Sequence, residues 1–245
     1  MTESEWLISV EPKALFYHLG PENDRKLRLL VANCFRRVWN CLSHPKTQGA
    51  LEFLEGVTPN DYSASEAERD AENAVWECES LEARIVARAI ADVLKDSRPL
   101  PFHMPCYEDM RERVTRYVDY PINTMNAIVR SLRLGSLEKD PDKAVALESK
   151  HQCHFLRDIF GNPFRPVTID PAWLVWRNGA VVKLAQSAYQ ERALPSGELE
   201  PERLAVLADA LEEAGCTDAQ ILGHLRSPGP HVRGCWVVDL FLGKC

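Results

Sequence analysis

The chain has 245 residues, of which 45% are hydrophobic and 27% charged, and its formal net charge is −7. These values are typical of a globular protein that can bury a core, and they exclude a largely disordered chain. The acidic balance argues against a protein that coats nucleic acid or a membrane surface. The sequence contains neither a stretch of roughly 18–20 apolar residues nor a signal-peptide pattern, so we expect a soluble, cytoplasmic protein without a membrane role.

The N-terminal part has helical periodicity. We expect helices over 12–19, 24–42 and 46–55, and then one long helix over about 65–95. Ser65 and Glu68 have the spacing of a capping box at the start of that long helix. Three prolines in 97–106 predict an extended loop, and helical patterning resumes over 107–134.

Two stretches of mixed aromatic, charged, Gly and Pro residues interrupt the C-terminal part. They are His154–Pro171, which we interpret as an irregular connector, and Ser227–Cys245 at the end of the sequence. Further helices are predicted over 141–160, from Asp170-Pro171 onward, and over 180–193, 201–214, 217–226 and 232–242.

The pattern predicts an all-α protein, because no segment alternates strictly between apolar and polar residues. We expect an irregular multi-helix bundle or helical array of roughly ten helices. An N-terminal half (1–135) and a C-terminal half (136–245) would be joined by the connector, or the two would form one continuous domain.

Several segments have distinctive sequences: LRDIFGNPFRPV, DPAWL, VVKLAQSAYQER, LADALEEAGC and GPHVRGCWVVDLFLGK, with SEWL and DRKLRLLVANCFRRVW near the N-terminus. Together they resemble a large paralogous family of uncharacterised proteins from planctomycete bacteria. The resemblance implies a soluble bacterial protein whose C-terminal half is a recurring module. It implies no activity and no catalytic residue.

Four groups of histidines and cysteines have spacings that could suit a metal. They are His151 with Cys153 and His154; His103 with Cys106; Cys34 with Cys41 and His44; and His224 with His231 and Cys235. Zinc needs four such ligands, and the CxxC spacing is absent. The favoured interpretation is free, packed cysteines and half-exposed histidines, without a metal or other cofactor. His151 and His154, which share a helix face, are the weak metal candidates.

A catalytic site is the less favoured alternative. His231, Cys235 and Asp239 would form a row if they lay on one helix, and such a row could activate a thiolate. The apolar residues around Cys235 suggest burial instead, and common catalytic motifs are missing from the sequence. We therefore expect a protein that is not an enzyme.

DNA binding is a further alternative, carried by the helix-turn-helix-like hairpin over 204–225. Its second helix offers Asp218, Gln220, His224 and Arg226, and the helix before it is acidic. Phosphate contacts need clustered Lys and Arg, so an ordinary helical hairpin is the favoured interpretation.

Charged residues within apolar surroundings predict a structural clasp between the two unusual stretches. The predicted clasp residues are Asp158, Asn162, Arg165, Arg233, Trp236 and Asp239. Because a buried charge needs a partner, we expect an Asp158–Arg233 or an Arg165–Asp239 pair.

The leading functional hypothesis is a non-enzymatic helical protein-interaction module. Its partner would be another protein, bound through a helical groove or through a basic helix face formed by Arg25, Arg28 and Arg36. An enzymatic or metal-assisted site between the halves is the alternative, and DNA binding is the third hypothesis.

Overall fold

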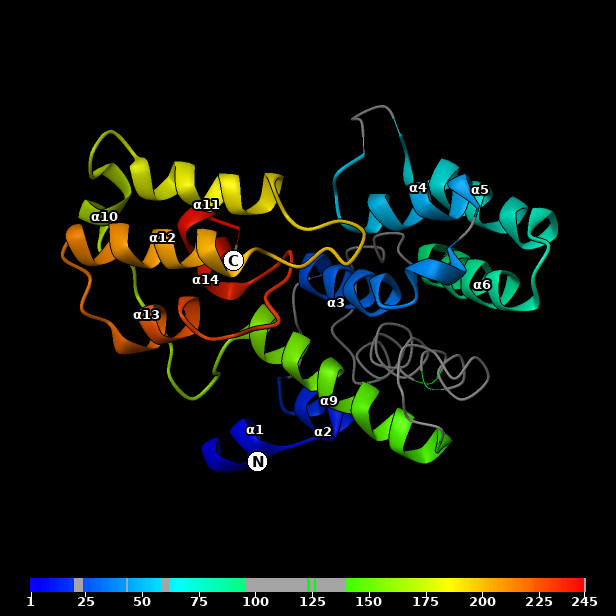
Figure 1. Ribbon diagram of the computed structural model, residues 1–245, viewed down its shortest axis with the longest axis horizontal. Helices are drawn as coiled ribbons and strands as arrows, with labels where there is room; N and C mark the ends of the chain where they lie inside the picture. The colour runs from blue at the N-terminus through cyan, green and yellow to red at the C-terminus, as the bar shows by residue number, and fades with distance from the viewer. Residues whose placement is uncertain are drawn as a thin grey trace, which may run out of the picture. The chain divides into compact units, whose positions relative to one another are not determined.

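The computed structural model describes residues 1–19, 24–42, 44–58, 62–95 and 140–244, with the single residues Asn123 and Asn126 (Figure 1). These ranges contain twelve α-helices and one short 3-10 helix, and their one β-type pairing is an isolated bridge between Glu198 and Val232. The all-α prediction is confirmed. The predicted loop at 97–106, the predicted helical segment 107–134 and the predicted boundary after residue 135 lie outside the described residues.

The chain divides into two compact units. Unit 1 consists of Met1–Leu7 and His154–Cys245, and unit 2 of Ile8–Cys153. The division therefore falls inside helix α9 (Pro141–Phe160). The residues at the beginning of the chain, which include most of helix α1 (Glu3–Ile8), belong with the C-terminal unit.

Unit 2 is built from helices that bury one apolar face each. They are α2 (Pro12–Leu19), α3 (Asp24–Arg36), the 3-10 helix η1 (Trp39–Cys41), α4 (Pro45–Leu54), α5 (Ala64–Glu77), α6 (Leu81–Lys95) and the first part of α9. Alanines at helical spacing on α5, such as Ala67, Ala71 and Ala74, are fully buried and allow α5 to pack closely against α4 and α6.

The predicted single helix over 65–95 is wrong, because the chain breaks between α5 and α6. Cys78 is extended, with φ −69° and ψ 134°, and the Ser80 hydroxyl accepts a hydrogen bond from the backbone of Ala83 at 3.1 Å. The capping box is also two residues earlier than predicted, at Ser63 and Glu66. The apolar periodicity continues on both sides of the break, so it does not reveal the break.

Arg36 does not belong to an exposed basic face, and this corrects its assignment as a partner-binding residue. Its guanidinium is buried and pairs with both carboxylate oxygens of Glu55, at 2.7 and 2.8 Å. It also lies over the ring of Trp39, 4.7 Å from the centroid. Arg25 and Arg28 are half-buried on the same helix.

Replacing Glu55 with Gln is expected to lower the free energy of unfolding by about 1.5–3 kcal/mol, because the buried guanidinium loses its charged partner. Glu77→Gln is a matched control, since Glu77 pairs with Lys46 at a partly exposed position of the same unit. It should cost less than about 1 kcal/mol. Denaturant unfolding measures both variants, and equal stability of the two would contradict a dominant role for the buried pair.

Five helices of unit 1 pack around one apolar cluster. The five helices are α10 (Pro171–Val175), α11 (Ala180–Gln190), α12 (Pro201–Glu213), α13 (Ala219–Leu225) and α14 (Trp236–Leu242). The predicted helix start at Asp170 is confirmed, because the Asp170 carboxylate caps α10. The helix predicted from Thr217 begins one residue later, with Asp218 as the cap of α13. Among the cluster's fully buried members are Val181, Leu204, Leu207, Leu211, Ile221, Val237 and Val238.

The last helix begins later than predicted, at Trp236 rather than at 232, and helix α9 extends to Phe160 into the predicted connector. Gly161 then turns the chain with φ 73°, and a Cβ there would lie only 3.2 Å from the Trp236 ring. This close approach brings the end of α9 against the start of α14. Among the described residues, no helix has the length and apolar character needed to span a bilayer.

Candidate metal centre

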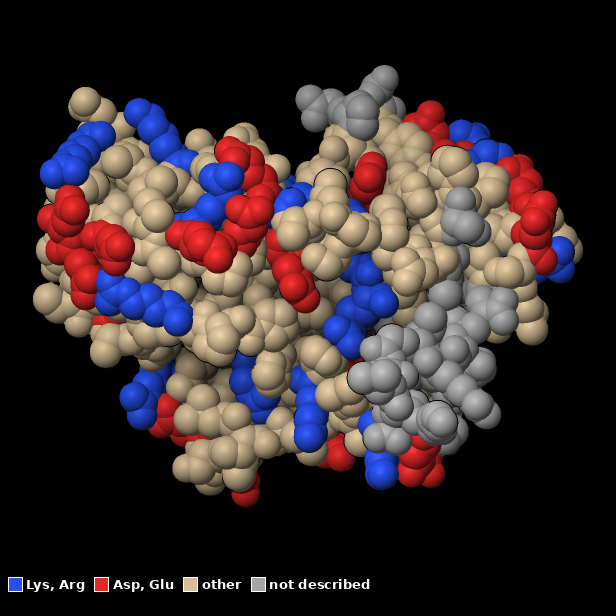
Figure 2. All heavy atoms as spheres, in the orientation of Figure 1, with Lys and Arg blue, Asp and Glu red and all other residues tan. Residues whose placement is uncertain are grey.

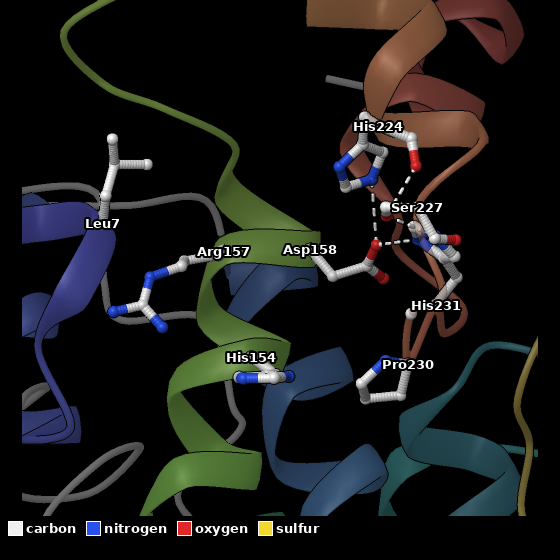
Figure 3. Close-up of a pocket in the computed structure, with 9 residues that line it drawn as sticks. Leu7, His154, Arg157, Asp158, His224, Ser227, Pro230 and His231 are labelled. Carbon is white, nitrogen blue, oxygen red and sulfur yellow. Dashed lines mark hydrogen bonds and ion pairs between the residues drawn. The ribbon is translucent and has the colours of Figure 1, made fainter.

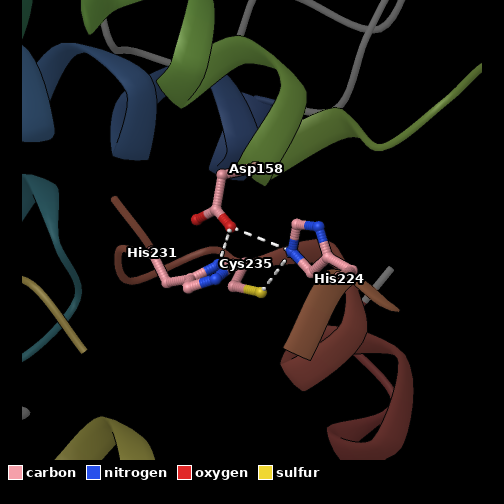
Figure 4. A group of neighbouring side chains, drawn as sticks. All are labelled: Asp158, His224, His231 and Cys235. Carbon is pink, nitrogen blue, oxygen red and sulfur yellow. Dashed lines mark hydrogen bonds and ion pairs between the residues drawn. The ribbon is translucent and has the colours of Figure 1, made fainter. Parts of the chain in front are cut away.

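Four side chains from distant parts of unit 1 converge on one point (Figure 4). They are Asp158 near the end of α9, His224 in the last turn of α13, His231 in the loop before α14, and Cys235 directly before α14. One potential ligand atom from each lies within 4.8 Å of all the others. The group therefore has the donors and the compactness of a metal centre.

The Asp158 carboxylate is the hub of this cluster. Its Oδ1 lies 2.7 Å from His231 Nδ1 and 3.0 Å from His224 Nε2. His224 Nε2 in turn lies 3.3 Å from Cys235 Sγ. Ligand atoms about 2.0–2.3 Å from a common zinc ion are separated by distances of this order, so small adjustments would suffice to form a tetrahedron.

The cluster is buried except at one edge. The side chains of Asp158 and His231 are 3% and 2% exposed, and Cys235 is fully buried. The His224 side chain is 18% exposed. Any exchange of an ion with solvent would therefore pass along His224.

Further hydrogen bonds already orient two of the ligands. Asp158 Oδ2 accepts the backbone N–H of Val232 at 2.8 Å, which leaves Oδ1 for the cluster. His231 Nε2 lies 3.2 Å from the Ser227 carbonyl oxygen and 3.1 Å from its hydroxyl. In this structure Nδ1 donates to the Asp158 carboxylate. Once Nδ1 has lost its proton it could bind a metal while Nε2–H donates to the Ser227 carbonyl, which is the usual arrangement behind a metal-bound histidine.

The pKa values follow from burial and from this pairing. Burial alone would raise the pKa of Asp158, but its hydrogen bonds to His224 and His231 together hold it below its usual range. Burial alone would lower the pKa of His231, but Asp158 outweighs burial and raises it. Burial and the Asp158 charge raise the pKa of Cys235 well above its usual value. Without a metal, Cys235 is therefore a neutral thiol rather than a nucleophilic thiolate.

Two hollows adjoin the exposed edge of the cluster. The first, of about 220 Å³, is lined by Asp158, His224 and His231, and also by Leu7, His154 and Arg157 (Figure 3). The second, of about 280 Å³, is lined by His224 and Trp236 together with Trp6, Leu7 and Arg157. Both hollows therefore border His224 on one side and the N-terminal segment on another.

The structure brings together only some of the predicted metal groups. His224, His231 and Cys235 meet, with Asp158 as a fourth donor that the sequence had not grouped with them. In the first predicted group Cys153 is fully buried whereas His154 is exposed, so the cysteine does not join the histidine, and the pair of His151 and His154 stays a prediction. His44 caps α4 and pairs with Glu77 instead. His103 and Cys106 lie outside the described residues.

The predicted catalytic row of His231, Cys235 and Asp239 does not form along one helix, because α14 begins after Cys235. The imidazole beside the Cys235 sulfur is His224. The buried Asp239 carboxylate accepts a hydrogen bond from the Tyr189 hydroxyl at 2.7 Å.

The predicted clasp pairs are wrong in their partners. Asp158 pairs with histidines and not with Arg233, whose guanidinium lies over the Tyr189 ring. Arg165 pairs with Glu3 and not with Asp239, and Asn162 donates to the same Glu3 carboxylate at 2.8 Å. The two unusual stretches nevertheless touch, through Asp158 with Val232 and through Gly161 with Trp236.

Several polar residues of the hairpin of α12 and α13 make contacts within unit 1. His224 belongs to the cluster, and Gln220 donates to the Arg165 carbonyl. Arg226 pairs with Asp209 and Glu212 of α12. On the face in view, Lys and Arg are interspersed with Asp and Glu (Figure 2). The arginine at the end of the predicted recognition helix is therefore paired with acidic side chains, and DNA binding by this hairpin stays an untested hypothesis.

Comparison of the chain with known protein families, with curated proteins and with solved structures finds no match. The resemblance to planctomycete proteins thus stays a prediction, and the residues themselves have to carry the functional argument.

Proposed function

We propose that unit 1 is a structural metal-binding module that holds one divalent transition-metal ion, Zn²⁺ above all, between Asp158, His224, His231 and Cys235. The convergence of these four ligand atoms within 4.8 Å is the observation that carries the proposal. Their burial, and the hydrogen bonds that orient Asp158 and His231 from behind, support it.

The donor set favours zinc over other common ions. Two imidazole nitrogens, one thiolate and one carboxylate suit a borderline-soft ion in a tetrahedral site. Magnesium and calcium prefer oxygen donors throughout. Four protein ligands also fill a tetrahedral site completely, which is typical of structural rather than catalytic zinc.

The proposed ion would join segments that are separate along the chain. It would link the end of α9 to α13 and to the loop before α14, and two of its ligands come from loop or cap positions. In this proposal the chain as a whole is a non-enzymatic helical module that contacts another protein. Buried cysteines without a disulfide, among them Cys34, Cys78, Cys216 and Cys235, support a reducing, cytoplasmic setting.

Reconstitution with Zn²⁺ and removal of excess ion should leave about one zinc per chain by elemental analysis. Cys235→Ser should weaken zinc binding by at least about 100-fold. Loss of a hydrogen bond behind a ligand costs about 10–100-fold in metal affinity, and loss of a ligand should cost more. Cys216→Ser is the matched control, because Cys216 is a buried thiol of the same unit outside the cluster. With Co²⁺ as the probe, the thiolate charge-transfer absorption should vanish only in Cys235→Ser.

A chain that retains no stoichiometric zinc or cobalt after reconstitution would refute the proposal. Equal retention by Cys235→Ser and by the unchanged protein would refute the assignment of these ligands.

A further inference from the structure

The N-terminal segment Thr2–Leu7 contacts the rest of unit 1 through a charged side chain and through its backbone, and it contains a buried tryptophan. The Glu3 carboxylate pairs with Arg165 and accepts a hydrogen bond from Asn162. The Trp6 side chain is 1% exposed. The Trp6 carbonyl oxygen accepts two hydrogen bonds from the Arg157 guanidinium, at 2.9 and 2.7 Å. The segment is therefore anchored by charge and by its backbone.

These anchors lie next to the candidate metal centre. Arg157 directly precedes Asp158 on α9, and Figure 3 shows their side chains leaving the helix in different directions, with Leu7 on the Arg157 side. Trp6 and Leu7 line the larger hollow opposite His224, and Leu7 also lines the smaller one. The segment thus forms a wall of both hollows that give access to His224.

We propose that Thr2–Leu7 is a latch that slows exchange of the bound ion; this inference rests on the proposed metal centre. The other three ligands are buried, so an ion or a competing chelator reaches the centre past His224. With the latch closed, Trp6 and Leu7 narrow that approach, and the Arg157 contact holds the last turns of α9 in place. Opening the latch leaves all four ligands in the chain but removes the wall in front of them.

The test compares rates of metal release from the full chain loaded with Co²⁺. After rapid mixing with excess EDTA, loss of the cobalt absorption gives the rate constant. Glu3→Gln with Trp6→Ala should release cobalt at least about ten-fold faster, because the closed state of the segment loses both its ion pair and its buried anchor. Glu3→Gln alone, which leaves the core intact, should give a smaller acceleration in the same direction.

Glu213→Gln is the matched control, because it breaks another exposed ion pair of unit 1, with Arg177, that lines neither hollow. Its release rate should equal that of the unchanged protein. The cobalt spectrum before mixing should be the same in all variants, since no ligand is altered.

Equal release rates in the latch variants and in the control, with cobalt fully bound at the start, would overturn the latch and leave the metal centre standing. Absence of cobalt binding in every chain, the unchanged protein included, would overturn both. A slower release from the latch variants would also refute a gating role.

Discussion

Replacing Asp158 with Ala is expected to lower the stability of unit 1 by about 3–5 kcal/mol in metal-free protein, the cost of removing one partner from a buried charged pair. The substitution leaves the imidazole of His231 and the N–H of Val232 buried without their acceptor. Hydrogen exchange, followed by mass spectrometry over α13 and α14, measures the loss within this unit of the full chain. Protection there should fall while that of unit 2 is retained.

Asp158→Asn separates the charge from the shape of this side chain. The amide oxygen can still accept from Val232, but the negative charge that attracts the two imidazoles is lost, so the cost should be lower than for Ala. Asp170→Asn is the control: Asp170 caps α10 on the surface, and Asn caps a helix about as well. If both Asp158 variants lost no more protection than the Asp170 control, the role of Asp158 as the hub of the cluster would be contradicted.

Sequence spacing groups three of the four proposed ligands, although the sequence favours packed cysteines and half-exposed histidines without a metal. His224, His231 and Cys235 fall within a short segment, and their residue types suit zinc, so spacing alone groups them. Asp158 lies 66 residues before His224, and no local pattern links the two. The fold supplies the fourth donor, because α9 ends against α13 and the loop before α14.

The sequence predicts the burial of some charges correctly but not of all: Arg165, expected in buried surroundings, has a side chain that is 66% exposed. The apolar surroundings of Asp158 and Asp239 predict that both carboxylates are buried, and the structure places both inside. Asp158 pairs with histidines rather than with the predicted Arg233, and Asp239 accepts a hydrogen bond from the Tyr189 hydroxyl. Composition indicates that a buried charge needs a partner, but only the tertiary arrangement decides which donor is near enough.

The same limit explains the arginines of α3. Helical spacing places Arg36 on a polar stripe with Arg25 and Arg28, but spacing does not show what packs against the end of the helix. In the structure Glu55, at the end of α4, reaches Arg36 and the pair is buried. A residue at a helix end can thus be buried although helical periodicity places it on the solvent-facing stripe.

Zinc is expected to stabilise unit 1 by about 4 kcal/mol at a free concentration 1,000 times the dissociation constant, because only the folded unit gathers the four ligands. At one fixed concentration of free zinc, the stabilisation should grow from pH 6 to pH 8, because the dissociation constant falls as the pH rises. Bound zinc requires a neutral His231 and a Cys235 thiolate, so protons compete with the ion at low pH. Thermal unfolding at buffered free zinc, at both pH values, measures the effect.

Metal-free protein should show the opposite trend over this range. The pKa of His231 is raised in the folded state, so its pairing with Asp158 stabilises fully below the unfolded histidine value near 6.5 and is lost as the pH rises through the folded value. Asp158 does not reverse this trend. Its pKa is lowered in the folded state, so the stability that it contributes is lost only when the carboxylate is protonated, in acid. A Cys235→Ser variant should follow the metal-free trend even with zinc present. If zinc stabilised that variant as strongly as the unchanged protein at pH 8, the ion would be bound elsewhere.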